Sequence, residues 1–475
     1  MSVELEPYSD VAALRTALDG IATVRTDGLE LHDAAGFRAK VIDRLVASAV
    51  FGDDELRSAS RWLIRAAAPE LGAFLASVHD LYIAGGQGIY QNATAPAINV
   101  RGLTYDVART IFRAARTTGT KIVLFEIARS EMGYTEQRPA EYAAAVLAAA
   151  IKENHQGPVF VQGDHFQANA KNYAKAPAGE IAAVRELALE AITAGFYNID
   201  IDASTLVDLS LPNVTDQQKI NADHSFELTA AIREAEPEGI TISIGGEIGE
   251  VGSQNSTVEE LHAFMESYTS QLATRGNGER LTGISKISVQ TGTSHGGVPL
   301  PDGSVAEVNV DFATLAKLSR VAREEYGLGG AVQHGASTLP PEAFDRFAEA
   351  NAIEVHLATA FQNQMYDSSA FPADLKEAIY THLAANHADE RKPNQTDAQF
   401  YYTTRKRGFG PFKQRLWSLP AETRAEIMAD LEPSFELVMR RLGVAGSADL
   451  VDKTIKRVDV PCSEAPERLR ETVAR

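Results

Sequence analysis

Hydrophobic positions follow two different periods along the chain, and the change comes near residue 90. Before it, apolar residues recur at spacings of three and four in the segments 37–51 and 61–83, which is the period of amphipathic helices. Glycine, asparagine and proline then interrupt the pattern in the segment 85–96. We therefore expect a helical N-terminal extension over residues 1–90.

Short β-rich runs alternate with longer helical stretches after this break. The strands within them look buried on both faces, as parallel strands are. The eight runs are 96–100, 121–128, 158–165, 197–204, 241–249, 286–297, 329–337 and 352–360. Eight parallel strands, each followed by a helix, predict an α/β fold of the (β/α)8 TIM-barrel type over residues 91–385. An open doubly wound sheet is the alternative, but the glycine-rich dinucleotide fingerprint is missing after the first run.

The alternation stops near residue 385, where a loop-like, aromatic and basic segment begins at 392–417. Helical patterns follow it, so we expect a helical C-terminal extension over residues 386–475. Its cations stand out in a chain whose net charge is −19. Because a guanidinium suits phosphate or sulfonate, Arg405 and Arg407 are candidates for binding an anionic substrate group across the barrel mouth. A solvated surface patch or a subunit contact is the alternative.

Composition excludes several classes of protein. The chain has 475 residues, 44% of them hydrophobic, which permits a sizeable core. Its acidity disfavours general nucleic-acid binding. The sequence contains no apolar run of about 18 residues that could span a bilayer, so we expect no membrane partner. The single cysteine excludes an internal disulfide framework or a thiolate cluster. The acidic N-terminal sequence lacks a signal pattern, so we expect a cytoplasmic enzyme, with a soluble binding protein as the alternative.

Polar residues occupy the C-terminal ends of the predicted strands, where barrel enzymes place their reacting groups. Three of them, His165, His295 and His334, lie on three different strands, each within two residues of a glycine. A lone histidine in a strand is more often a core residue. Three together, with an open fourth position, are typical of a catalytic zinc site.

The motifs around these residues resemble those of class II, zinc-dependent fructose-bisphosphate aldolases and their ketose-bisphosphate aldolase relatives. They are GDH at 163–165, IDAS at 201–204, GEIGEVG at 246–252, GTSHGG at 292–297 and QHGAST at 333–338, after an opening strand that carries Asn99. The similarity covers roughly residues 95–365. It implies a class II aldolase, a carbon–carbon lyase, with one catalytic Zn²⁺.

The resemblance also implies roles for these residues. His165, His295 and His334 would bind the zinc, and Asp164 would exchange a proton with the hydroxyl at the cleaved bond. The carboxylates Glu247 and Asp202 match an alternative or second metal position, which leaves room for a second divalent or a monovalent cation. Asp202 can equally hydrogen-bond a ligand histidine.

Substrate-binding residues follow from the same resemblance. Gly296, Gly335 and Ser337 match positions that hold the ketone's phosphate, and Asn99 matches a substrate contact. The family's eighth strand ends in Asn-Ile-Asp-Thr-Asp, whereas HLATA stands at 356–360 here. We therefore expect His356 and Thr359 to recognise a different substrate.

Glu250 is the candidate base that protonates the enediolate, because the family's loop glutamate has no counterpart here; a solvated loop charge is the alternative reading. Together these residues predict an aldolase that cleaves or forms an anionic, phosphorylated ketose through a zinc-stabilised enediolate. The expected partners are a small sugar and further copies of the chain, as a dimer or larger homo-oligomer.

Two other functions remain open. Segments 125–135 and 163–169 resemble the accessory subunit of tagatose-bisphosphate aldolases, which indicates a non-catalytic supporting role. A zinc hydrolase on the same barrel is the other alternative.

Overall fold

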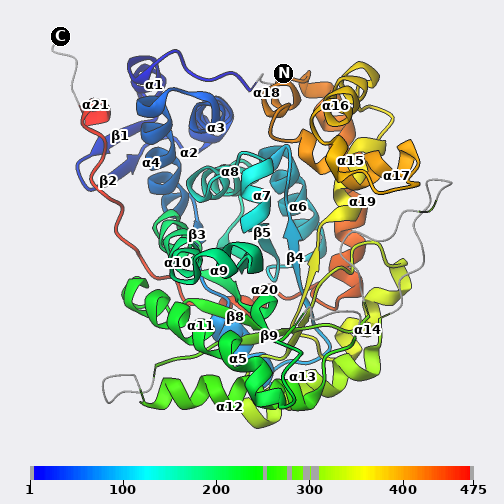
Figure 1. Cartoon of the computed structure of the whole chain (residues 1–475). Helices are drawn as coiled ribbons and strands as arrows, with labels where there is room; N and C mark the ends of the chain where they lie inside the picture. The colour runs from blue at the N-terminus through cyan, green and yellow to red at the C-terminus, as the bar shows by residue number, and fades with distance from the viewer. Residues whose placement is uncertain (1–4, 250–253, 275–280, 293–299, 301–309, 471–475) are drawn as a thin grey trace.

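A closed parallel barrel forms the centre of the protein, as the alternating pattern predicts (Figure 1). The computed structural model describes residues 5–249, 254–274, 281–292, 300 and 310–470. Eight of the nine strands of the larger sheet form the barrel, and pairing of β6 with β7 closes it. They are β4 (Ala95–Asn99), β5 (Leu124–Ala128), β6 (Gly157–Gln167), β7 (Asn198–Asp202), β8 (Ser243–Glu247), β9 (Lys286–Val289), β10 (Ala331–Gln333) and β11 (Glu354–Leu357). The (β/α)8 prediction is confirmed.

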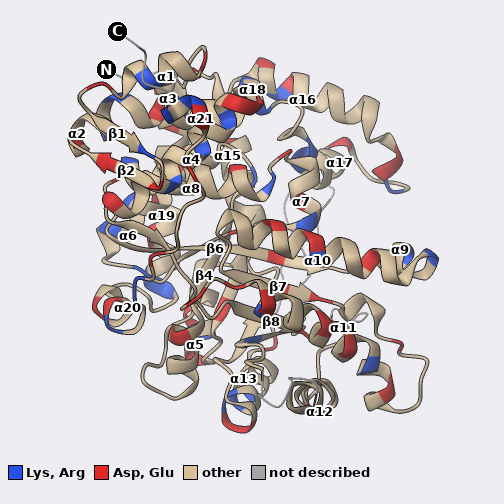
Figure 2. Ribbon diagram, turned by 90° about the vertical axis from the view of Figure 1, so that its left-hand side faces the viewer, with Lys and Arg blue, Asp and Glu red and all other residues tan. Residues whose placement is uncertain are grey.

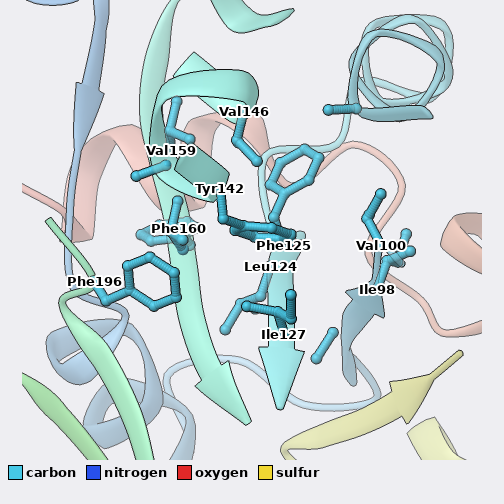
Figure 3. Packing of buried hydrophobic residues seen from close by; sticks show 14 of the residues in the cluster. Ile98, Val100, Leu124, Phe125, Ile127, Tyr142, Val146, Val159, Phe160 and Phe196 are labelled. Atoms are coloured by element: carbon cyan, nitrogen blue, oxygen red, sulfur yellow. The ribbon is translucent and has the colours of Figure 1, made fainter. Parts of the chain in front are cut away.

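Helices surround the barrel and cover its apolar outer face. Those from the barrel segment are α6 (Thr104–Thr118), α7 (Arg129–Tyr134), α8 (Pro139–Lys152), α9 (Ala170–Lys175), α10 (Pro177–Ala194), η2 (Ser204–Leu206), α11 (Val214–Ala235), α12 (Val258–Thr274), α13 (Phe312–Tyr326), η3 (Pro341–Ala343), α14 (Phe344–Glu349), α15 (Thr359–Asp367) and α16 (Ala373–Asn386). Figure 3 shows Phe125, Tyr142 and Phe160 packed between α8 and the strands. Acidic and basic residues are spread along the outer helices (Figure 2).

The first ninety residues form helices together with short strands. The helices are α1 (Val11–Ala17), α2 (Ala34–Gly36), η1 (Phe37–Val41), α3 (Ile42–Phe51), α4 (Asp54–Glu70) and α5 (His79–Gly86). A hairpin of β1 (Ala22–Arg25) and β2 (Gly28–Leu31) and a further strand, β3 (Ala73–Leu75), were not indicated by the helical period. Strands of four residues or fewer are too short to show a period of their own. β3 pairs with the first part of β6 and so ties this region to the barrel.

The C-terminal region covers one side of the barrel and then returns to the N-terminal region. Its elements are η4 (Ala388–Glu390), α17 (Asp397–Thr404), η5 (Arg405–Gly408), α18 (Lys413–Trp417), α19 (Ala421–Arg441), α20 (Ala448–Thr454) and α21 (Glu467–Arg470). The Trp62 indole donates a hydrogen bond to the Ser463 carbonyl at 2.7 Å, and the Ala465 amide donates to the Thr26 carbonyl at 3.0 Å. None of the helices in the described ranges is long and apolar enough to cross a membrane.

Candidate active site

A cavity of about 600 Å³ opens at the C-terminal ends of the barrel strands. It brings together sequence-predicted residues from four different strands or the loops that follow them: Asn99, Asp164, His165, His334, Gly335, Ser337, His356 and Thr359. Three other predicted residues, Glu250, His295 and Gly296, lie outside the described residues. The barrel mouth is therefore the place where the candidate chemistry converges.

A β-bulge in β6 turns Asp164 and His165 toward this cavity. Gly163 pairs with Ile199 and Phe166 with Ile201, so β6 contains one more residue than its partner between these pairs. His165 adopts a left-handed backbone with φ of +41°, an uncommon conformation that clusters at functional sites. Gly163 is required because a Cβ there would lie 2.4 Å from the Phe166 ring. The sequence Gly-Asp-His-Phe thus builds the bend that aims both side chains.

His165, His334 and Glu247 form a group that fits a metal ion. One ligand atom from each lies within 4.8 Å of the others, and the two imidazole rings are 4.1 Å apart. Two imidazoles and a carboxylate are a donor set found in catalytic zinc sites. Burial and the neighbouring histidines His356 and His165 hold the pKa of His334 well below its usual value, so its ring is neutral, as a ligand must be.

The electrostatics of this group favour bound positive charge. Burial opposes protonation of His165, but the carboxylates of Asp164 and Glu247 outweigh burial and raise its pKa well above the usual value. The His165 Nδ1 atom lies 3.2 Å from Glu247 Oε2. A cation placed among these carboxylates would meet the same attraction as the imidazolium proton does.

Asp202 lies behind His165 and does not line the cavity. Its Oδ2 lies 3.1 Å from His165 Nδ1 and accepts a hydrogen bond from the Gln167 amide at 2.5 Å. Its Oδ1 accepts from the amide and the hydroxyl of Ser204 at 2.9 and 2.7 Å. A carboxylate fixed at both oxygens can orient the His165 ring.

Asp164 is the carboxylate that faces the cavity next to the metal group. Its Oδ1 lies 3.5 Å from His334 Nε2 and 3.2 Å from His356 Nδ1. Burial would raise its pKa, but His165 and His356 outweigh burial and hold the pKa well below its usual value. Asp164 is therefore ionised and able to accept a proton.

Comparison with known proteins agrees with this geometry. The family model for class II fructose-bisphosphate aldolase matches residues 89–406. The chain belongs to this family. A search of curated proteins finds no match.

Solved structures share the fold at low sequence identity. The fructuronate-tagaturonate epimerase of Cohnella laeviribosi is 12% identical, covers 90% of each chain and gives a TM-score of 0.52. A protein of Sinorhizobium meliloti 1021 described as a probable tagatose 6 phosphate kinase is 17% identical, covers 79% of this chain and 96% of its own, and also gives 0.52. The YdjI aldolase of Escherichia coli K12 is 14% identical over 79% of this chain and all of its own, with a TM-score of 0.45.

This aldolase-family chain also contains polar residues that the motifs did not reveal. His356, on β11, places Nδ1 2.9 Å from Glu126 and Nε2 2.6 Å from Glu354. Burial raises the pKa of Glu126 to about 8, although His356 partly offsets this. The signal for both glutamates was present, because each is the single acidic residue of its run, 121–128 or 352–360.

A lysine lies at the centre of the barrel, among the residues that do not line the cavity. Lys286, at the start of β9, is fully buried, and its Nζ lies 2.5 Å from Glu354 Oε1, 3.0 Å from Asp200 Oδ2 and 2.8 Å from Gln162 Oε1. Burial lowers the pKa of its ammonium, but Asp200 and Glu354 outweigh burial and raise it. Lys286 is therefore charged and acts as the counter-ion of a buried carboxylate group.

The structure does not bring Arg405 or Arg407 to the cavity. Arg405 is buried, pairs with Asp367 at 2.9 Å and donates to the Asn363 side chain at 3.1 Å. Arg407 pairs with Glu390 at 3.1 Å. The residue between them, Lys406, lines the cavity instead.

Proposed function

We propose that the protein is a metal-dependent aldolase that cleaves or forms a carbon–carbon bond in an anionic ketose. The observation that supports this most is the position of Asp164. Its carboxylate is ionised, buried at the base of the cavity and next to the metal-binding group formed by His165, His334 and Glu247. An aldol cleavage needs a base at the hydroxyl and a positive centre at the carbonyl, and this arrangement offers both.

The metal would be held by His165 and His334, with Glu247 beside them and His295 as the third predicted histidine. A zinc ion bound by these residues supplies a Lewis acid for the oxygen that gains charge when the bond breaks. Asp202 keeps the His165 ring in place through its contact with Nδ1. A second cation at Glu247 or Asp202 stays a prediction.

The protein's own groups would carry the proton transfers and position the substrate. Asp164 accepts the proton of the substrate hydroxyl, and His356 fixes the Asp164 carboxylate through its Nδ1 atom. Gly335, whose φ is +71°, and Ser337 line the cavity where the ketone's anionic group would bind main-chain amides. Asn99 and Thr359 contribute polar groups to the same wall.

The direct test measures cleavage by the zinc-loaded protein over a panel of phosphorylated and carboxylated ketoses, with detection of the released aldehyde. His334→Ala should remove both bound zinc and cleavage. His32→Ala, which makes the same change on the N-terminal hairpin, should leave both intact. Zinc-independent cleavage by the wild type, or full cleavage by His334→Ala, would refute the proposal.

A second candidate is epimerisation of an anionic ketose. The structure of the fructuronate-tagaturonate epimerase matches 90% of this chain, including parts of both extensions, at a TM-score of 0.52. Cleavage of the bond, rotation of the aldehyde and reformation of the bond would give an epimer from the same groups. Formation of an isomer without free aldehyde would favour this candidate over the aldolase.

Two further alternatives give different outcomes in the same assays. An accessory subunit would show no turnover alone and would copurify with a homologous chain. A zinc hydrolase would show chelator-sensitive hydrolysis with no aldol product.

A further inference from the structure

Three consecutive cations of η5 have different charged neighbours, and one of them lines the cavity. In a 3₁₀ turn there are three residues per turn, so neighbouring side chains diverge widely. Arg405 points to Asp367 and Arg407 to Glu390, whereas Lys406 joins the lining of the cavity. The turn therefore presents a single ammonium to the substrate space.

Every other charged residue that lines the cavity has an opposite charge beside it. Arg101 pairs with Glu131 at 2.7 Å, and Arg129 pairs with Glu180. Glu126 and Asp164 lie 2.9 and 3.2 Å from His356. Lys406 forms no ion pair with any residue in the described ranges. Among the described residues, Lys406 is thus the one charged lining residue without an ion-pair partner.

Glu131, the carboxylate that could neutralise Lys406, has no capacity left for it. Its two oxygens already accept from the side chains of Asn99, Arg101 and Tyr134 and from the Ala128 amide. Arg101 contributes two of its nitrogens to this group, at 2.8 and 2.7 Å. A carboxylate offers about four acceptor sites, and these donors fill them.

Lys406 is half-buried, so its charge is not fully screened by water. Burial lowers the pKa of Lys406, and the nearby cations Arg101 and Arg407 lower it further. Its Nζ lies 5.8 Å from the centre of the Tyr134 ring, which gives only weak compensation. A bound anion would stabilise the Lys406 ammonium against its burial and against repulsion by Arg101 and Arg407.

We propose that Lys406 is the anion-recognising residue of the cavity and that it selects ketoses with a phosphate or carboxylate remote from the cleaved bond. This inference rests on the proposed function for the identity of the substrate, because the cavity that contains Lys406 is the same one that contains Asp164. The C-terminal extension therefore supplies a specificity residue to the barrel.

Binding to the zinc-loaded full chain tests the proposal without turnover. The probes are D-fructose 6-phosphate, D-fructuronate and D-fructose, which differ in the group at carbon 6, and affinity is measured by calorimetry. We expect the wild type to prefer at least one anionic probe over D-fructose by about 10- to 100-fold, the range for a charge-assisted contact. The anionic probe with the larger preference identifies phosphate or carboxylate as the natural group.

Lys406→Met should reduce this preference to within about threefold, as expected when a charge-assisted hydrogen bond is lost, and leave D-fructose binding unchanged. Lys406→Arg should keep most of it. The matched control is Lys392→Met, the same change at an exposed lysine of the same extension.

Three results would overturn the proposal: no anionic preference in the wild type, an unchanged preference in Lys406→Met, or equal weakening of D-fructose. Loss of the preference in Lys406→Met together with no cleavage by the wild type would refute the proposed aldolase while supporting the anion subsite.

Discussion

Two groups of buried charged residues lie one below the other inside the barrel, and only one of them contains a lysine. In the inner group, Asp200 and Glu354 surround the Lys286 ammonium. In the outer group, Asp164, Asp202 and Glu247 surround the His165 and His334 rings at the cavity.

The difference between the groups lies in what neutralises the carboxylates. An ammonium on a strand is a permanent counter-ion, and Lys286, Asp200 and Glu354 do not line the cavity themselves. The outer group relies on imidazoles, which can either hold a proton or bind a metal. A barrel can thus use aspartate and glutamate side chains for stability in one layer and for chemistry in the next.

The largest effect should come from the outer group. Asp164→Asn keeps the size of the side chain but cannot accept a proton, so kcat should fall about 10²- to 10⁴-fold, the usual contribution of a general base. Zinc content and thermal unfolding should change little. Steady-state kinetics measures kcat, and metal analysis and thermal unfolding check that zinc binding and the fold are retained. An unchanged kcat would assign the base to another residue.

The inner group should respond in stability rather than in chemistry. Lys286→Met leaves Asp200 and Glu354 buried without their cation, which should lower the free energy of unfolding by about 3–5 kcal/mol. Denaturant unfolding measures the loss.

Adding Glu354→Gln to Lys286→Met provides the control, because it removes one of the stranded charges and should recover part of the stability. If the Lys286→Met single variant is as stable as the wild type, Lys286 is not the counter-ion of this group.

Asp202→Asn tests the support of a metal ligand and should have a smaller effect. The loss of a carboxylate that holds a ligand histidine typically costs about 10- to 100-fold in metal affinity or activity. Zinc affinity is measured by competition with a chelator. Ser210→Ala, which removes a hydroxyl from an exposed loop, is the control, and equal zinc affinity in both variants would contradict the role given to Asp202.

The smallest effect should come from Asp200, through its dependence on pH. Burial raises the pKa of Asp200 to about 6, although Lys286 partly offsets this. In the folded protein Asp200 therefore keeps its proton at pH values where the unfolded chain has lost it. The free energy that this carboxyl contributes is present below about pH 4 and is lost as the pH rises to about 6.

Asp200→Asn should remove that decline, and its stability at pH 7 should lie within about 1 kcal/mol of the wild type. The measurement is the difference in unfolding free energy between the two proteins from pH 4 to 7. A difference that does not vary over this range would refute the raised pKa.

Much of the barrel follows from sequence because its strands are buried on both faces. Each of β4 to β11 lies within or overlaps one of the eight apolar runs. The strand-end motifs locate Asp164, His165 and His334 for the same reason, since the C-terminal ends of parallel strands share one face. The predicted oligomer, the second cation and the boundaries of the extensions stay predictions.

The residues that sequence reasoning missed depend on contacts between distant parts of the chain. Lys286 and Glu354 are 68 residues apart, and neither belongs to a motif. Lys406 is adjacent in sequence to Arg405 and Arg407, and the short turn places its side chain, but neither of theirs, in the cavity lining. The guanidinium chemistry favoured the two arginines, but Asp367 and Glu390 already occupy them.

The return of the C-terminal segment to the N-terminal hairpin has a consequence for biosynthesis. The Ser463 and Ala465 contacts with Trp62 and Thr26 join segments that are synthesised far apart in time, since Trp62 and Ser463 are 401 residues apart. Lys406 also emerges after every strand of the barrel. A nascent barrel therefore completes its strands before the ribosome releases the lysine that we assign to substrate choice, and Trp62 and Thr26 gain these contacts only after the barrel strands have been made.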